Sequence, residues 1–118
     1  MSKFVDKLKS QVEQQDDFKF FGIEPQNTGR ALLFELRFRS GRRLGFPYSY
    51  LTKLDFEPSE GITIYASDVV ILVKGRNLDV VFNYLLQNRL TYIREDETGT
   101  DTSSEGETFI ESIEIKDR

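Results

Sequence analysis

Three carboxylates close together in the sequence are the side chains best suited to acid–base or metal chemistry. Asp55, Glu57 and Glu60 lie near one another, and two such groups can act as general acid and base or bind Mg²⁺. Asp55 and Glu57, however, alternate with Leu54 and Phe56, so we expect them on the outward face of a strand, where solvated carboxylates stay ionised. We therefore expect no catalytic residues, no metal site and no cofactor.

The residue types that the sequence lacks narrow the chemistry further. The 118 residues include no Cys and no His. Without Cys there is no disulfide, thiolate nucleophile, Fe–S cluster or zinc–thiolate site. Without His there is no Ser-His triad and no imidazole metal ligand. These absences favour a binding function over an enzymatic one.

Four arginines form the main candidate binding patch. Arg37, Arg39, Arg42 and Arg43 lie on the outward face and turn of a predicted hairpin, with several tyrosines nearby in the sequence. Such a patch could hold a phosphate backbone while aromatic rings stack on bases. Arginines on a solvated hairpin also provide solubility and protect a sheet edge. Nucleic-acid binding is therefore an alternative hypothesis and not the main one.

Arg76 is a further candidate for anion binding, because it precedes a predicted helix. Gly75, Arg76 and Asn77 place a base and free backbone N–H groups at a helix N-terminus, where anions bind. No Walker or dinucleotide-binding glycine pattern accompanies these residues. A structural turn with a helix cap is the alternative interpretation.

The apolar pattern predicts that these residues are carried mainly by β-strands. Pro47 marks one strand as an edge strand or a bend, because proline cannot donate a ladder hydrogen bond. Val69–Val73 is apolar on both faces and is expected to be the best-buried strand. Leu32 is expected to point inward with the alternating apolar residues that follow it. The predicted strands cover residues 18–25, 31–39, 42–48, 54–57, 62–66, 69–73 and 91–94.

Two helices are expected in addition. Residues 3–15 have apolar side chains at helical spacing, which predicts a short amphipathic helix across one end of the core, or one that enters a partner's groove. The segment Asn77–Arg89 predicts a helix with Asn77 as its N-cap. Its apolar stripe is wide enough to pack on a sheet and consists of Leu78, Val81, Phe82, Leu85 and Leu86.

Charge is distributed unevenly along the chain, whose net charge is −4. Residues 1–94 carry 14 Lys and Arg against 11 Asp and Glu, giving +3, whereas residues 95–118 carry 2 against 9, giving −7. Residues 95–108 hold six acids and no apolar residue. We expect one domain over residues 1–94, followed by an acidic flexible linker or loop that could cover the arginines.

The last ten residues regain apolar alternation and form the candidate interaction strand. Residues 109–118 could add a strand to an exposed sheet edge, within the molecule or on a neighbour, or remain a tail. The apolar side chains of this segment are Phe109, Ile110, Ile113 and Ile115.

A membrane span is not expected. Charged residues interrupt the N-terminus where a signal peptide would need an apolar core. The longest apolar run, Val69–Val73, is far shorter than the roughly 18–20 residues that cross a bilayer. We therefore expect a cytoplasmic location.

Several motifs resemble known families over roughly residues 30–94. The segment Phe46–Leu51, the Pro58-Ser59 turn, Ile62–Ile64 and Gly75–Leu78 are similar to a family of small uncharacterised bacterial single-domain proteins, a resemblance that implies no activity. The order of elements is also similar to pleckstrin-homology-like and GRAM-type domains, in which a helix plugs a strongly bent sheet. A helix before bent strands is similar to Sm-like small barrels.

Together these patterns predict an α+β fold. We expect a strongly bent antiparallel sheet, or a partly open small barrel, packed by the Asn77–Arg89 helix. The biochemical function is not readable from the residues. We expect a non-catalytic binding or protein-interaction module, with a protein partner or a homo-oligomer. The alternatives are a nucleic-acid-binding small barrel and a pleckstrin-homology-like ligand-binding domain.

Overall fold

The fold consists of two four-stranded sheets and one α-helix within the residues that the computed structural model describes, 18–25, 29–101 and 106–118. The N-terminal helix expected over residues 3–15 lies outside the described residues. The elements in chain order are β1 (Phe21–Ile23), β2 (Leu33–Arg37), β3 (Arg43–Pro47), the 3₁₀ turn η2 (Tyr48–Tyr50), β4 (Leu51–Glu57), β5 (Gly61–Ala66), β6 (Val69–Arg76), α2 (Asp79–Leu86), β7 (Leu90–Arg94) and β8 (Phe109–Asp117).

The first sheet has the strand order β1-β7-β2-β3 and is mixed. Strand β7 pairs antiparallel with β1 and parallel with β2. The expectation of a purely antiparallel sheet is therefore wrong for this half, because alternation shows which side chains share a face but not the direction of the neighbouring strand. Pro47 lies in β3, which is an edge strand as its proline predicted.

The second sheet has the order β4-β5-β6-β8 and is antiparallel throughout. The C-terminal strand β8 pairs with β6 from Phe109 to Asp117. Of the three alternatives for residues 109–118, the structure therefore shows a strand paired within the molecule, and not a free tail or a strand added only to a neighbour. The register shifts between Lys74 and Gly75. A Cβ at Gly75 would collide with the carbonyl group of Phe109, so only glycine permits this close approach.

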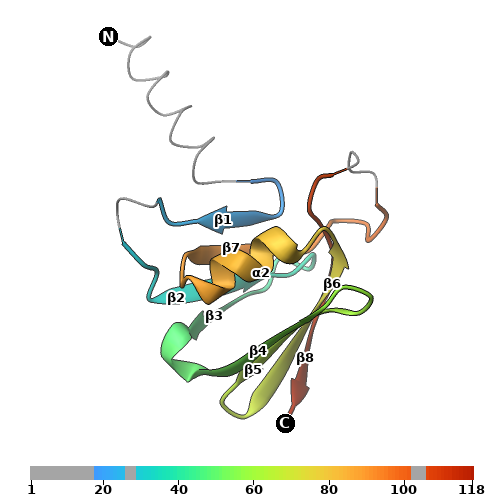
Figure 1. The fold of residues 1–118 in the computed structure, drawn as a ribbon. Helices are drawn as coiled ribbons and strands as arrows, with labels where there is room; N and C mark the ends of the chain where they lie inside the picture. Colours follow the sequence, from blue (N-terminus) through green and yellow to red (C-terminus); the bar gives the residue numbers. More distant parts are fainter. Residues whose placement is uncertain (1–17, 26–28, 102–105) are drawn as a thin grey trace, which may run out of the picture.

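The core lies where the two sheets and α2 face one another (Figure 1). Phe34 and Leu36 of β2, Ile64 of β5 and Ile71 of β6 are fully buried there. Helix α2 packs against β4 and β7, with the Phe82 ring centroid 5.4 Å from that of Phe56. The described residues thus form two sheets and not the single bent sheet or small barrel that the sequence predicted.

Helix α2 is shorter than predicted, and its first turn is built differently. Asn77 was expected to be the N-cap, but it adopts the left-handed conformation with φ 55°. Its Nδ2 donates to the Glu107 carbonyl at 2.8 Å, and the Thr108 hydroxyl donates to the Asn77 carbonyl at 2.8 Å. The N-cap position is Leu78, which makes no side-chain capping bond. Asparagine tolerates this backbone conformation better than most residues, so it serves here as a turn residue.

Two burial expectations fail for local reasons. Leu32 is 87% exposed instead of inward, because β2 begins only at Leu33. Val70 and Leu72 of β6 are half-buried, since the outer face of the second sheet is not covered by another described element. None of the helices in the described residues is long and apolar enough to cross a membrane.

Candidate functional site

The hairpin of β2 and β3 brings Arg37 and Arg43 opposite each other, with Glu35 on the same outward face. Glu35 Oε1 accepts from Arg37 Nε at 2.6 Å, and Glu35 Oε2 accepts from Arg43 Nε at 2.8 Å. The hydrogen bond from Arg43 is the largest influence on the pKa of Glu35, and with Arg37 it lowers that pKa against the opposing effect of desolvation. Arg37 also stacks on Tyr92, 3.8 Å from the ring centroid.

Arg39 is engaged by the segment that follows β7. Its backbone N–H donates to Glu95 Oε1 at 2.9 Å. Its guanidinium donates to the carbonyls of Asp96 at 2.9 Å and Glu111 at 2.8 Å. Arg42, in the hairpin turn, is the one arginine of the four whose side chain has no partner among the described residues. The arginine patch is therefore largely committed to contacts within the molecule.

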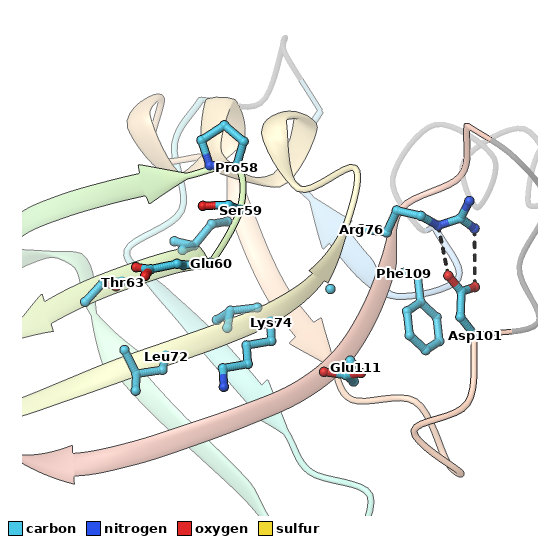
Figure 2. A pocket seen from close by; sticks show the side chains of 13 residues that line it. Pro58, Ser59, Glu60, Thr63, Leu72, Lys74, Arg76, Asp101, Phe109 and Glu111 are labelled. Carbon is cyan, nitrogen blue, oxygen red and sulfur yellow. Dashed lines mark hydrogen bonds and ion pairs between the residues drawn. The ribbon is translucent and has the colours of Figure 1, made fainter.

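Arg76 lies apart from the hairpin, at the end of β6. Its Nε lies 2.9 Å from Asp101 Oδ2, and its Nη2 donates to Asp101 Oδ1 at 3.3 Å. Figure 2 shows this two-point contact beside the ring of Phe109. The predicted anion site is thus occupied by a carboxylate of the chain itself. Arg39 and Arg76 are both held by the acidic segment, although Arg39 lies in the turn between two strands of the first sheet and Arg76 ends a strand of the second.

The described part of the acidic segment makes defined contacts. Glu95 joins two elements, because its Oε1 accepts from Arg39 and its Oε2 accepts from the Ile113 amide at 2.8 Å. Asp96 Oδ2 accepts from the amides of Thr98 and Gly99 at 3.0 and 2.9 Å. Desolvation is the largest single influence on the pKa of Asp96 and raises it, but these hydrogen bonds together bring the pKa below its ordinary value.

The carboxylates first considered for catalysis do not converge. Asp55 and Glu57 are exposed on β4, and Glu60 lies in the turn that follows it. Within the ranges that the structure describes, no group of three or more His, Cys, Asp or Glu side chains could hold a metal ion.

A wide, open cavity lies over the end of β6 that carries Arg76. It has a volume of about 540 Å³ and combines both signs of charge with apolar side chains. Figure 2 shows Lys74 and Glu60 directed over this open face. The cavity is lined by Pro58, Ser59, Glu60, Ile62, Thr63, Leu72, Val73, Lys74, Gly75, Arg76, Asp101, Phe109 and Glu111. It is wide and its charged groups are mostly exposed, which does not favour a specific small ligand.

The four residues of the candidate interaction strand serve the molecule's own core. Phe109, Ile110 and Ile113 are buried, and Ile115 is partly buried against the same core. Their side chains are therefore not presented to a partner. What β8 does present is one free backbone edge, since it is the outermost strand of its sheet.

An apolar surface that the sequence pattern did not reveal surrounds Tyr48. The Tyr48 hydroxyl donates to the Leu90 carbonyl at 2.8 Å, and burial raises the pKa of this phenol. Tyr48 and Asn88 help to line two hollows, of about 510 and 330 Å³. We call this surface the Tyr48 corner, and its exposed apolar side chains are Leu32 (87%), Leu33 (51%), Tyr50 (56%) and Leu86 (57%).

Three separate elements form the Tyr48 corner. The start of β2, the η2 turn and the end of α2 lie on the same side of the molecule (Figure 1). Leu32 and Leu33 come from the first, Tyr50 from the second and Leu86 from the third. Leu86 belonged to the predicted apolar stripe of the helix, but the helix ends there and leaves it outside the core. Leu86, at the end of the predicted apolar stripe of the helix, was the one residue of this surface that the helix pattern singled out.

No protein-family model, curated protein or solved structure matches the chain. The resemblances to the small bacterial family, to pleckstrin-homology-like domains and to Sm-like barrels therefore stay predictions.

Proposed function

We propose that this chain is a non-catalytic protein-interaction module that binds a partner protein through the Tyr48 corner. The observation that carries the proposal is that exposed Leu32 and Leu33 line one hollow with Tyr48 and exposed Leu86 lines another, with exposed Tyr50 in the same turn as Tyr48. Exposed apolar side chains grouped in this way mark binding sites on soluble proteins, because covering them with a partner removes apolar surface from water, which is favourable in free energy. The two hollows beside Tyr48 offer places for apolar side chains of the partner.

The rigidity of the corner supports the same function. Tyr48 is fixed by its hydrogen bond to Leu90, and the Tyr48 amide donates to the Leu32 carbonyl at 3.0 Å. The Ala31 amide donates to the Asn88 carbonyl at 2.7 Å, which joins the start of β2 to the end of α2. A surface that is already ordered loses less conformational entropy when it binds.

Nucleic-acid binding receives less support from the same structure. Arg37 and Arg43 share Glu35, and Arg39 is bound to Glu95 and to two carbonyls. Each guanidinium would exchange an existing contact for a phosphate contact, which reduces the net gain. Arg42 has no such competing contact among the described residues, and it therefore serves as the probe of this alternative.

The experiment compares the full chain with two variants of the corner, Leu32→Glu and Leu86→Glu. A protein captured from lysate by the wild-type chain is identified by mass spectrometry, purified and titrated calorimetrically. We expect each variant to raise the dissociation constant about tenfold or more, since a charge would be buried against apolar side chains. The matched control is Val80→Glu, at the other end of α2, where Val80 is 40% exposed.

The outcomes separate the hypotheses. Equal loss of affinity in Val80→Glu and Leu86→Glu, or no loss in either corner variant, would contradict the assignment of the corner. Binding of single-stranded RNA at low salt that is weakened by Arg42→Glu would instead support the nucleic-acid alternative. Far-UV circular dichroism and melting of each variant verify that the fold is retained.

A further inference from the structure

The free edge of β8 is covered over its first half by other parts of the chain. The Ile110 carbonyl accepts from the Asp96 amide at 2.9 Å, and the Glu111 carbonyl accepts from Arg39 at 2.8 Å. The Ile113 amide donates to Glu95 at 2.8 Å. These contacts occupy backbone groups that face away from β6, so this half of the edge is closed to another strand.

Within the described ranges, the second half of the same edge is not covered. In an antiparallel strand, backbone groups face the two sides in alternation. The Ile113 amide faces away from β6, whereas the Arg118 amide faces inward and donates to the Asp68 carbonyl at 2.9 Å. Ile115 and Asp117 therefore also direct their amides outward. Among the described residues these two amides and the carbonyls of Ile113 and Ile115 have no hydrogen-bond partner.

The side chain of Arg118 anchors the end of this open half to neighbouring strands. Its guanidinium donates to the Ser67 carbonyl at 3.1 Å and to the Thr52 hydroxyl at 3.3 Å, and lies over the ring of Tyr65 with a centroid distance of 5.4 Å. The end of β8 is thereby tied to the β5–β6 turn and to β4. An edge strand that is already extended and ordered is prepared for pairing with another strand.

We propose that the open half of the β8 edge pairs with the same segment of a second copy of this chain, antiparallel and with Ile115 opposite Ile115. The free backbone groups are self-complementary in this register. The two Ile115 residues exchange two N–H···O bonds, while each Ile113 amide keeps its bond to Glu95 of its own copy. The partner strand ends where Glu95 and Arg39 close the edge.

The charges on the outward face select this register. Glu114 and Lys116 both point outward, because Ile113 and Ile115 point to the core. With Ile115 on the two-fold axis, each Glu114 lies opposite Lys116 of the second copy. Shifting the register by two residues places Glu114 against Glu114 or Lys116 against Lys116, which is unfavourable. Opposite charges across the axis therefore favour one alignment.

Charge reversal tests the proposal on the full chain. Analytical ultracentrifugation at low salt should show a monomer–dimer equilibrium. Glu114→Lys and Lys116→Glu each place two pairs of like charges across the axis, and we expect the dimer dissociation constant to rise about tenfold. The double variant Glu114→Lys/Lys116→Glu restores opposite charges and should return the constant close to that of the wild type.

A matched control and a backbone measurement complete the test. Glu57→Lys makes the same change in net charge as Glu114→Lys, but on the exposed side of β4, and should leave the monomer–dimer equilibrium unchanged. Hydrogen–deuterium exchange at the Ile115 amide should slow as protein concentration rises. A chain that stays monomeric up to millimolar concentration overturns the proposal. A dimer with equal constants for single and double variants also overturns it. Neither result depends on the Tyr48 corner, which lies on other elements.

Discussion

At the scale of single residues, Glu35 partly neutralises the positive charge of the β2–β3 hairpin. One carboxylate receives both Arg37 and Arg43, and side-chain exposure of Glu35 is only 22%. The alternation of β2 already placed Glu35 and Arg37 on one face, and the hairpin register adds Arg43. This part of the site was within reach of the sequence. The contact of Arg39 with Glu95 was not, because the two residues lie 56 positions apart.

Glu35→Gln should remove a pH-dependent contribution to stability. The pKa of Glu35 is lowered from its ordinary 4.5 by the two arginines, so its contribution is present above that value and is lost as the pH falls through the lowered pKa. We expect a cost below about 1 kcal/mol at pH 7, since the pair is partly solvated. Urea unfolding at pH 7 and pH 3 measures it, and the difference from the wild type should shrink at pH 3.

The control for this prediction is Glu60→Gln, which removes a carboxylate that has no arginine partner among the described residues. It should change the free energy of unfolding at pH 7 less than Glu35→Gln does. An equal loss in both variants would show that the arginine contacts do not stabilise the fold.

Gly75→Ala should be strongly destabilising for a steric reason. A Cβ at Gly75 would collide with the Phe109 carbonyl, so β6 and β8 would have to separate locally. We expect a cost of about 2 kcal/mol or more. Gly45→Ala is the control, because a Cβ there would meet only Leu33 Cδ1 at 3.9 Å. Chemical denaturation compares the two, and similar costs would contradict the steric account.

At the scale of elements, β8 is part of the core and not an appendage. The Ile110 side chain of β8 is completely buried. In the described sheet, β8 is the neighbour of β6 on the side opposite β5. From the sequence, this strand could pair within the molecule or with another molecule. Apolar alternation predicts a strand but does not show which strand it pairs with. Spacing did find α2, but its first turn depends on Glu107 and Thr108, which lie far along the chain from Asn77.

Changes in β8 should therefore unfold the protein and not merely release a tail. Ile110→Ala leaves a cavity and should cost about 2–5 kcal/mol, whereas Lys116→Ala, at an exposed position, should cost little. A chain that ends before Phe109 should lose its native circular dichroism spectrum. Cooperative melting of that shortened chain near the wild-type temperature would refute the structural role of β8.

At the scale of the whole molecule, Glu95 links the two sheets on the surface. Its carboxylate joins Arg39, which follows β2, to Ile113 of β8. Composition alone indicated a solvated acidic segment, because the specific acceptors of each carboxylate come from the assembled fold. The division into two sheets was likewise beyond the sequence, since it depends on which strands become neighbours.

Glu95→Ala should weaken this link without unfolding the core. We expect a loss of about 1–2 kcal/mol, since two hydrogen-bond donors lose their acceptor. Hydrogen exchange should accelerate at the amides of Arg39 and Ile113 and stay unchanged at the Ile71 amide in the middle of the second sheet. Glu97→Ala, an exposed change two residues away, is the control. Acceleration in both variants would assign the effect to the whole segment.

The position of β7 between β1 and β2 has a consequence for biosynthesis. Strand β1 pairs only with β7, and the two are separated in sequence by most of the domain. During translation, Phe20 and Phe21 therefore emerge long before the strand that completes their sheet. The β4–β5–β6 meander, by contrast, is local in sequence and can pair early. The nascent chain thus carries unburied aromatic rings at least until residue 94 leaves the ribosome, and Phe20 waits further for Phe109, whose ring it contacts at a centroid distance of 5.5 Å. A chaperone would act in this interval.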